Sequence, residues 1–474
     1  MDVGGRASVA RQSGRPGLER LARIFLGSIF LFRLAFCALV YERPQLAIAN
    51  DSDRYVPLAN AILDGQGYGW NTDHPGELLN TAGYPLFLTG AFLVLGHNAG
   101  DVALAQLLAT GSAALILYVL LLRRTGPRAA FLAAIMLLLD PLTILWSMTI
   151  LTEAVFAAAL GVSAVLLAAW AYSQNRWTLV LAGLFGALAS LVKPLALPIL
   201  AVWFVGLTFF PTRGGGPASR RMIAVVVRGL IFVLPTIILV GPWFVRNQLL
   251  WNCPTLASVD RVTLRDYMAA KVLAEVRHED LEAIQAELQA QDPGVCPIQS
   301  GKYLQILRDH PATYARLHAA GTVPVLFATN FDRWLQYFGL EYALPDLWRP
   351  YLDGGWTGIA RVLGEQMRDF PGAIALMLGL MGFQVVLYLL ATAGVFSTLR
   401  GSSRPAKWIV ALLVTAIAVL VFAPGQGGHE RFRVPVQPML AILVAHGGAV
   451  YAARTGLGRD AGSPRVALKS RNVP

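Results

Sequence analysis

Four short polar motifs lie beside apolar runs, where a charged side chain is costly and therefore indicates a function or a paired network. The first, Asp51-Ser-Asp-Arg-Tyr55, combines two carboxylates with a guanidinium. A carboxylate can accept a proton from a hydroxyl group, and a guanidinium can bind a phosphate through two parallel hydrogen bonds. The alternative is a solvated helix start, in which Asp51 or Asp53 caps the helix that follows. The motif alone leaves both interpretations open.

The next two motifs each hold one charge. Glu153 follows the apolar stretch 148–151 and directly precedes another apolar run. It either serves a site or favours the dipole of the helix that begins there. Lys193 stands before Pro194 with apolar residues on both sides, so it needs an anion. That anion is either an ordinary lipid headgroup or the phosphate of a bound lipid.

The fourth motif, His429-Glu-Arg-Phe-Arg433, carries Arg431 and Arg433. These arginines suit a phosphate or a sugar carboxylate, and the alternative is an anchor at the membrane interface. His429 could ligate a metal, but the sequence offers it no other ligand at a suitable spacing. A glycine-rich phosphate loop and the zinc-ligand patterns are also missing. We therefore assign no metal ligands and name no cofactor; a divalent metal stays open as an alternative that the sequence does not support.

The elements that position these motifs are membrane helices. Of the 474 residues, 55% are hydrophobic and 14% are charged, whereas soluble domains are about 25% charged. Because a spanning helix needs about 20 mostly apolar residues, the sequence predicts an all-α polytopic membrane protein with about ten transmembrane helices. The predicted spans are 24–41, 102–122, 129–149, 154–172, 178–191, 195–210, 222–241, 372–396, 408–423 and 438–452. The net charge of +11 fits basic cytoplasmic loops. No basic face with interleaved aromatics supports nucleic-acid binding.

Loop charge predicts the orientation of these spans. The positive-inside rule puts both termini in the cytoplasm and residues 42–101 on the outer side. All four polar motifs then lie at the outer face. This placement favours an enzyme or receptor open to the outer leaflet over a transporter, whose polar groups gather near the midplane. Residues 84–96 are apolar but reach only about 20 Å as a helix, so we expect them to dip into the outer leaflet.

The chain divides by these expectations into five parts. They are a basic cytoplasmic N-terminus (1–23), a transmembrane module (24–245) whose first outer loop (42–101) carries the catalytic motif, a small and mostly helical outer domain (246–371), C-terminal transmembrane helices (372–452) and a basic cytoplasmic tail (453–474).

The outer domain is expected to contain an amphipathic helix over 265–291 and a second over 302–317, interrupted before Pro311. It also holds Cys253 and Cys296. In an oxidising compartment these two cysteines are expected to pair. The bridge would contribute about 4 kcal/mol by closing a loop of about 43 residues. The alternative is two unpaired thiols.

Six short pieces, in order along about residues 20–450, resemble the GT-C glycosyltransferases that use polyprenyl-phosphate sugars. The similar groups are the lipid A aminoarabinose transferases, the protein O-mannosyltransferases and the rhizobial galacturonosyltransferase-like enzymes. The pieces are Asp51-Ser-Asp-Arg-Tyr55, Ala82-Gly-Tyr-Pro-Leu-Phe-Leu88, Leu151-Thr-Glu153, Leu191-Val-Lys-Pro194, Pro242-Trp-Phe-Val-Arg-Asn247 and Glu430-Arg-Phe-Arg-Val-Pro435. Many relatives have Asp-Glu where this chain has Asp51-Ser52, which leaves Asp51 and Asp53 as alternatives for one role.

The resemblance implies an inverting glycosyltransferase in the bacterial inner membrane, with its active site on the periplasmic face. The donor would be a polyprenyl-phosphate-linked sugar, and the acceptor a glycolipid, a polysaccharide or a protein. Asp51 is the expected general base, with Asp53 as the alternative, and Glu153 would orient the acceptor or support the base. The residues expected to bind the lipid phosphate or the donor are Arg54, Tyr55, Tyr84, Lys193, Arg246, Arg431 and Arg433.

Two other classes of function remain as alternatives. One is a transporter or flippase of lipid-linked glycans, which would move the lipid across the bilayer without cleaving its sugar phosphate. The other is an inactive sensor or assembly scaffold on the same fold. The sequence does not identify the sugar, the acceptor or the oligomeric state.

Overall fold

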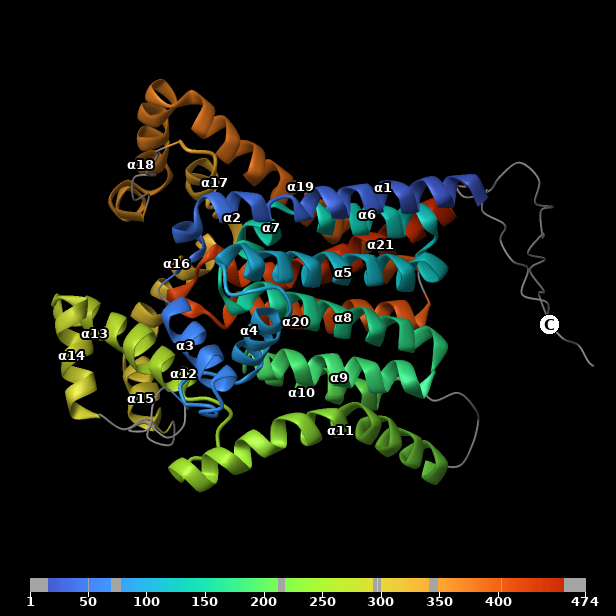
Figure 1. The fold of residues 1–474 in the computed structure, drawn as a ribbon, viewed down its shortest axis with the longest axis horizontal. Helices are drawn as coiled ribbons and strands as arrows, with labels where there is room; N and C mark the ends of the chain where they lie inside the picture. Colours follow the sequence, from blue (N-terminus) through green and yellow to red (C-terminus); the bar gives the residue numbers. More distant parts are fainter. Residues whose placement is uncertain are drawn as a thin grey trace, which may run out of the picture.

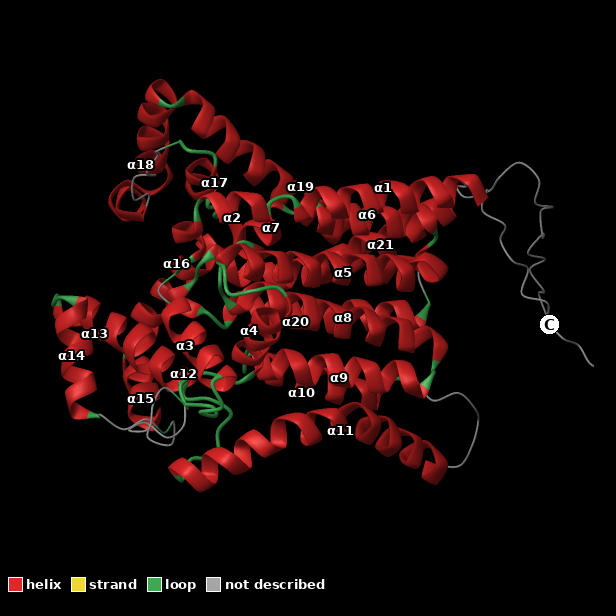
Figure 2. Ribbon diagram, viewed as in Figure 1, coloured by secondary structure: helices red, strands yellow, loops and turns green. Residues whose placement is uncertain are grey.

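The structure, a computed structural model, describes residues 16–49, 51–69, 78–211, 218–292, 296, 300–340, 348–401 and 403–455. Within these residues every regular element is a helix and no strand occurs, as Figure 2 shows. Long helices lie side by side in a bundle, and shorter helices gather at one end of it (Figure 1). The predicted all-α membrane fold is confirmed.

All ten predicted spans are helical. They correspond to α1 (Pro16–Leu34) with α2 (Cys37–Glu42), α5 (Ala99–Thr125), α6 (Pro127–Leu138) with α7 (Pro141–Ser147), α8 (Thr152–Ser173), α9 (Arg176–Val192), α10 (Ala196–Phe209), α11 (Ala218–Trp251), α19 (Pro371–Gly401), α20 (Arg404–Phe422) and α21 (Gln437–Thr455). Among the described residues, six helices are long and apolar enough to cross a membrane, or seven if the bent pair α6–α7 counts as one span. The helices α4 (Gly83–Val94), α9 and α10 are apolar but shorter.

The third predicted span is broken rather than continuous. The helices α6 and α7 meet at an angle of 46°, and Asp140 caps α7 by accepting a hydrogen bond from the Thr143 amide at 2.8 Å. The break leaves carbonyl groups without helical partners inside the bundle. The buried guanidinium of Arg33 donates to two of them, Leu138 at 2.9 Å and Leu137 at 3.3 Å. Irregular backbone at this depth requires such internal partners.

The two ends of the bundle differ in character. The α5–α6 and α8–α9 connections lie at one end (Figure 1), and the helix ends beside them carry the basic residues Arg123, Arg124 and Arg176. At the opposite end lie α3 (Ser52–Leu63), α7 and the short helices after α11. The basic loops and the polar motifs are therefore separated by the length of the bundle, as the charge pattern predicts.

A helical lobe lies beyond that opposite end. It comprises α12 (Val259–Val262), the π-helical turn η2 (Thr263–Ala269), α13 (Ala270–Arg277), α14 (Leu281–Gln291) and α15 (Gly301–Asp309). Its own core contains Ala269, Ala270, Leu273, Ile284, Leu288 and Tyr303. A disulfide joins Cys253 to Cys296 across 43 residues.

Of two sequence expectations about this region, one is wrong and one is confirmed. The single helix expected over 265–291 is wrong, because the chain turns at His278, whose φ is 57°, and restarts at α14. The interruption before Pro311 is confirmed, since α15 ends at Asp309 and α16 (Pro311–Phe327) begins with the proline. The helices α17 (Phe331–Tyr337) and α18 (Trp348–Asp369) follow.

The structure describes only some of the boundaries between the five parts expected from the sequence. The helix α11 continues without interruption past the expected boundary at 245/246, to Trp251. Residues 1–15 of the N-terminal part and 456–474 of the tail lie outside the described residues, as do 70–77 of the first outer loop.

Candidate active site

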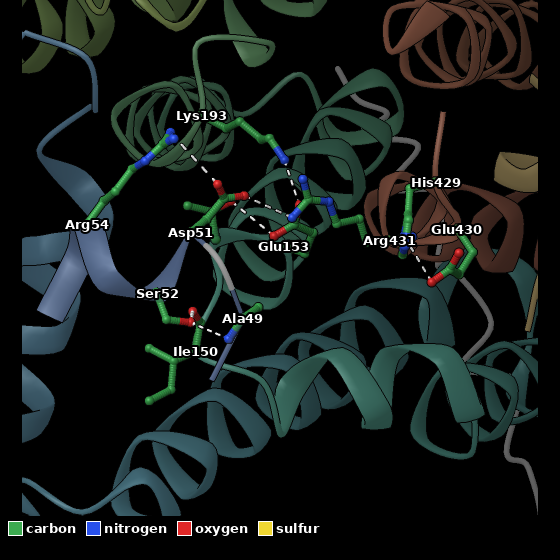
Figure 3. Close-up of polar contacts among 11 residues, drawn as sticks. Ala49, Asp51, Ser52, Arg54, Ile150, Glu153, Lys193, His429, Glu430 and Arg431 are labelled. Carbon is green, nitrogen blue, oxygen red and sulfur yellow. Dashed lines mark hydrogen bonds and ion pairs between the residues drawn. The ribbon is translucent and has the colours of Figure 1, made fainter. Parts of the chain in front are cut away.

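Five charged side chains from four segments meet at the end of the bundle that carries the lobe, and we call them the charged cluster. They are Asp51, Arg54, Glu153, Lys193 and Arg431 (Figure 3). An Nη1 atom of Arg431 lies 3.0 Å from Asp51 Oδ2, and its Nε lies 3.6 Å from Glu153 Oε1. Lys193 Nζ lies 2.8 Å from Glu153 Oε1, and Arg54 Nη1 lies 3.8 Å from Asp51 Oδ1.

Asp51 is the residue directly before α3. Its carboxylate makes no capping hydrogen bond to the helix and faces Arg431 instead. The neighbouring Ser52 is buried and fixes this turn, because its hydroxyl accepts from the Ala49 amide at 2.9 Å and donates to the Ile150 carbonyl at 2.8 Å. The helix-cap interpretation of Asp51 is therefore wrong in this structure.

Glu153 lies in the first turn of α8 and is only 2% exposed. Lys193 follows the last residue of α9 in an extended conformation (φ −149°, ψ 123°), which the following Pro194 favours. The segment before α4 holds this turn, because Thr81 donates to the Val192 carbonyl at 2.8 Å. Gly83 also packs against the same backbone, where a Cβ atom would lie 2.5 Å from the Leu191 carbonyl carbon.

Aromatic rings border the cluster. The rings of Tyr55 and Tyr84 meet edge to face at 5.0 Å, and Lys193 Nζ lies 4.7 Å from the centre of the Phe432 ring. Burial raises the pKa of the Tyr55 hydroxyl above its ordinary value, and the carboxylates of Glu153 and Asp51 add to this shift. Tyr55 therefore stays protonated at neutral pH and can serve only as a hydrogen-bonding group.

The charged cluster contains three cations and two carboxylates, which leaves one positive charge in excess. Burial alone would lower the pKa of Arg431, but Glu153 and Asp51 raise it, so this guanidinium is charged. Four of the five side chains are partly open: Arg54 is 40% exposed, Asp51 31%, Arg431 27% and Lys193 22%. An anion arriving from outside the chain can therefore reach this site.

Several predicted site residues do not join the cluster. Asp53 is exposed. Arg433 is buried and donates to the Val325 carbonyl at 3.0 Å and the Ala328 carbonyl at 2.8 Å, which secures the end of α16. Arg246 donates to the Tyr68 carbonyl at 3.1 Å and lies over the rings of Tyr68 and Trp243. The role expected for Arg433 and Arg246 at the phosphate stays a prediction, and in this structure both side chains contact neighbouring segments of the chain.

His429 and Glu430 form a separate pair beside the cluster, with Nδ1 and Oε1 2.9 Å apart (Figure 3). The described residues contain no group of three or more His, Cys, Asp or Glu side chains arranged to hold a metal. In addition, the carboxylates of Asp51 and Glu153 are both paired with cations. This donor set does not fit a divalent metal, and we derive no step through one.

Sequence reasoning missed three residues that organise the site: Ser52, Gln106 and Phe432. Gln106 is fully buried in α5 and accepts a hydrogen bond from the Tyr84 hydroxyl at 3.1 Å. A lone glutamine within the apolar run 102–122 was the available signal, because an amide group at that depth needs partners.

Comparison with known proteins finds a family model that matches part of the chain. Residues 73–239, about a third of the chain, match the family model described as dolichyl-phosphate-mannose-protein mannosyltransferase. This stretch includes Tyr84, Glu153 and Lys193 and ends before Arg431. A comparison with curated protein sequences finds no match.

Solved structures that are similar to this chain include a crystal structure of the oligosaccharyltransferase of Archaeoglobus fulgidus tethered to an acceptor peptide. It is 13% identical, with a TM-score of 0.49 over 92% of this chain. This chain covers half the length of that protein. ArnT from Cupriavidus metallidurans in the apo state is 14% identical, with a TM-score of 0.35 over 92% of this chain and 78% of its own. The same ArnT bound to undecaprenyl phosphate is 14% identical, with a TM-score of 0.37 over 93% of this chain and 79% of its own.

The family match covers the part of the chain that holds α4, α8 and α9 and includes three of the six motifs named above in full. Those motifs supply Tyr84, Glu153 and Lys193 to one end of a helical bundle whose apolar spans suit a membrane. The match to this family model supports the assignment of the chain to the GT-C superfamily of membrane glycosyltransferases.

Proposed function

We propose that this protein is an inverting glycosyltransferase that moves a sugar from a polyprenyl-phosphate donor to an acceptor hydroxyl at the outer face of the bacterial inner membrane. The observation that supports it best is the charged cluster. It combines a partly exposed carboxylate with an excess of positive charge at the end of a membrane bundle. Base catalysis needs the carboxylate, and a departing lipid phosphate needs the positive charge.

Asp51 is the proposed general base. It takes the proton from the acceptor hydroxyl while the hydroxyl oxygen attacks the anomeric carbon from the face opposite the phosphate. The bond between that carbon and the phosphate oxygen breaks, and its electron pair leaves with the polyprenyl phosphate. Each step needs a polar group at a defined position: a base at the acceptor and cations at the leaving oxygen.

Arg54 and Lys193 are the proposed partners of the lipid phosphate. Both are partly exposed, so a phosphate can approach them without displacing a buried contact. Arg54 is held only loosely by Asp51, at 3.8 Å, and its other donors make no hydrogen bond within the described residues, so they are available for an anion. The buried carboxylate of Glu153 holds the ammonium group of Lys193. In this proposal Glu153 positions a phosphate-binding cation, and Asp51 acts as the base.

Asp51 is preferred over Asp53 because of their surroundings. Asp51 faces Arg431 and Arg54, whereas Asp53, two residues later, is exposed and has no polar contact in the described part of the chain. The pair offers a matched comparison, since both are aspartates at the start of the same helix.

The test is transfer activity of the purified protein with Asp51→Asn and Asp53→Asn. The probe is a labelled panel of polyprenyl-phosphate hexoses and pentoses. We expect Asp51→Asn to lower turnover at least about 100-fold, the range of general base catalysis, and Asp53→Asn to stay within about threefold. Near-normal turnover of Asp51→Asn would reject Asp51 as the base. Loss of activity in Asp53→Asn alone would transfer the role to Asp53.

A further inference from the structure

The irregular segment between α7 and α8, residues 148–151, is buried among helices from distant parts of the chain. Backbone carbonyls in such a place need hydrogen-bond donors, because a helix does not supply them. This segment ends directly before Thr152 and Glu153. Its shape therefore decides where the buried carboxylate of the charged cluster lies.

Side chains from other elements supply these donors. Gln106 Nε2, from α5, donates to the Thr149 carbonyl at 2.7 Å and to the Ser147 carbonyl at 3.1 Å. Ser52 Oγ, from α3, donates to the Ile150 carbonyl at 2.8 Å. The Ile150 amide donates in turn to the Ala47 carbonyl at 2.8 Å. The segment is thus tied on one side to the core of the bundle and on the other to the turn that carries Asp51.

The same two side chains also reach the rest of the site. The Gln106 Oε1 atom accepts from the Tyr84 hydroxyl, and Tyr84 packs against Tyr55. The amide orientation is determined by its neighbours, because a flipped amide would place its oxygen against two carbonyl oxygens. Ser52 is adjacent to Asp51. Gln106 and Ser52 are at most 2% exposed, so neither side chain can contact a substrate.

We propose that Gln106 and Ser52 are positioning residues for glycosyl transfer: they hold residues 148–151 in the shape that sets Glu153, and through it Lys193 and Arg431, relative to Asp51. This inference rests on the proposed function for its effect on turnover. Its structural part, the coupling between Ser52 and Glu153, can be measured without any transfer reaction.

The first test compares Ser52→Ala with Ser163→Ala. The two serines are matched, because Ser163 is also buried and donates to a backbone carbonyl, that of Ala182, at 2.7 Å. We expect Ser52→Ala to lower turnover by about 10- to 100-fold, the effect of a misplacement of about 1 Å at a reacting centre, and Ser163→Ala to stay within about threefold. Equal effects of the two substitutions would overturn the proposal. Gln106→Met removes the amide donors with similar volume and should lower turnover in the same range.

The second test separates positioning from general damage. Within the described residues, Gln106 makes no hydrogen bond to the turn that carries Asp51, so if it acts through Glu153, Gln106→Met should lower turnover by less than about threefold in a Glu153→Gln background. Full multiplication of the two effects would overturn the proposal.

A third measurement is independent of activity, and so distinguishes failure of this inference from failure of the proposed function. Glu153→Gln should lower the unfolding temperature less in the Ser52→Ala background than in the wild-type protein. An identical lowering in both backgrounds would contradict the coupling, whatever reaction the protein catalyses.

Discussion

The pair formed by Glu153 and Lys193 provides an asymmetric prediction. The two charged atoms are 2.8 Å apart, but Glu153 is 2% exposed and the Lys193 side chain 22%. Removing one member of a buried pair costs about 3–5 kcal/mol, because the charge that remains has lost both its partner and its water. The cost should therefore depend on which charge is left behind.

Lys193→Met leaves the buried carboxylate with the Thr152 hydroxyl at 3.1 Å and with Arg431 at 3.6 Å. Because these contacts remain, we expect a loss of about 2–3 kcal/mol, below the full range for a buried pair. Glu153→Gln leaves a lysine that can turn toward water and can still donate to the amide oxygen. We expect it to cost about 1–2 kcal/mol, nearer to the value for an exposed pair. The double substitution should cost less than the sum of the two.

The measurement is denaturant-induced unfolding in lipid–detergent micelles, followed by the fluorescence of the 11 tryptophans. Glu287→Gln is the control, because Arg277 and Glu287 are also 2.8 Å apart but are 39% and 37% exposed. An exposed pair of this kind should contribute no more than about 1 kcal/mol. If Glu153→Gln is at least as destabilising as Lys193→Met, or if the double substitution is additive, burial does not control this pair and the reasoning is refuted.

Three further predictions concern the surroundings of the site. Arg433→Ala should destabilise the protein by about 2–4 kcal/mol, because it leaves the carbonyls of Val325, which is buried, and Ala328, which is partly buried, without this donor. Unchanged unfolding together with weakened donor binding would return Arg433 to the phosphate site. Cys296→Ser should remove up to about 4 kcal/mol of chain-entropy stabilisation from the helical lobe. Amide hydrogen exchange in residues 259–291 should then become faster, and unchanged exchange would argue against the disulfide. Burial alone would raise the pKa of Asp292, but hydrogen bonds from Tyr303 and Arg261 hold it below its ordinary value. The ionised carboxylate should therefore stabilise the lobe at neutral pH, and this stabilisation should disappear as the pH falls through the lowered pKa. Asp292→Asn should abolish this acid-dependent loss of stability, and an unchanged pH profile of unfolding would contradict the prediction.

Much of this architecture follows from the sequence. Ten apolar segments predicted ten helical regions, and the alternation of basic loops predicted which end of the bundle would carry the polar motifs. Pro194 and Pro311 marked chain breaks because proline restricts the residue before it and cannot continue a helix. The count of spans was approximate, since α9 and α10, both predicted as spans, are apolar but short.

The site was predicted in part. Asp51, Arg54, Glu153, Lys193 and Arg431 meet, but Arg433, two residues after Arg431, points elsewhere. The two arginines lie on a 3-10 helical turn, whose register decides their directions, and the sequence alone does not give that register. Ser52 and Gln106 escaped notice because their importance comes from carbonyls of a buried irregular segment, which no local pattern reveals.

The turn at His278, between α13 and α14, is a second feature that the sequence did not predict. Neither glycine nor proline stands there, and the preceding residues favour a helix. The one available signal was Asp280, which caps α14 by accepting from the amides of Glu282 at 2.9 Å and Ala283 at 3.3 Å. An aspartate before a helical run predicts a helix start only weakly when the residues before it are also helical.

The most direct test of the proposed glycosyl transfer follows the fate of a labelled polyprenyl-phosphate sugar in proteoliposomes that contain the purified protein and a mixture of candidate acceptors. The proposal predicts that labelled sugar appears on an acceptor with inverted anomeric configuration, with an equal amount of free polyprenyl phosphate. Movement of the intact labelled lipid from one leaflet to the other, with its sugar–phosphate bond uncleaved, would contradict the proposal and identify a flippase instead.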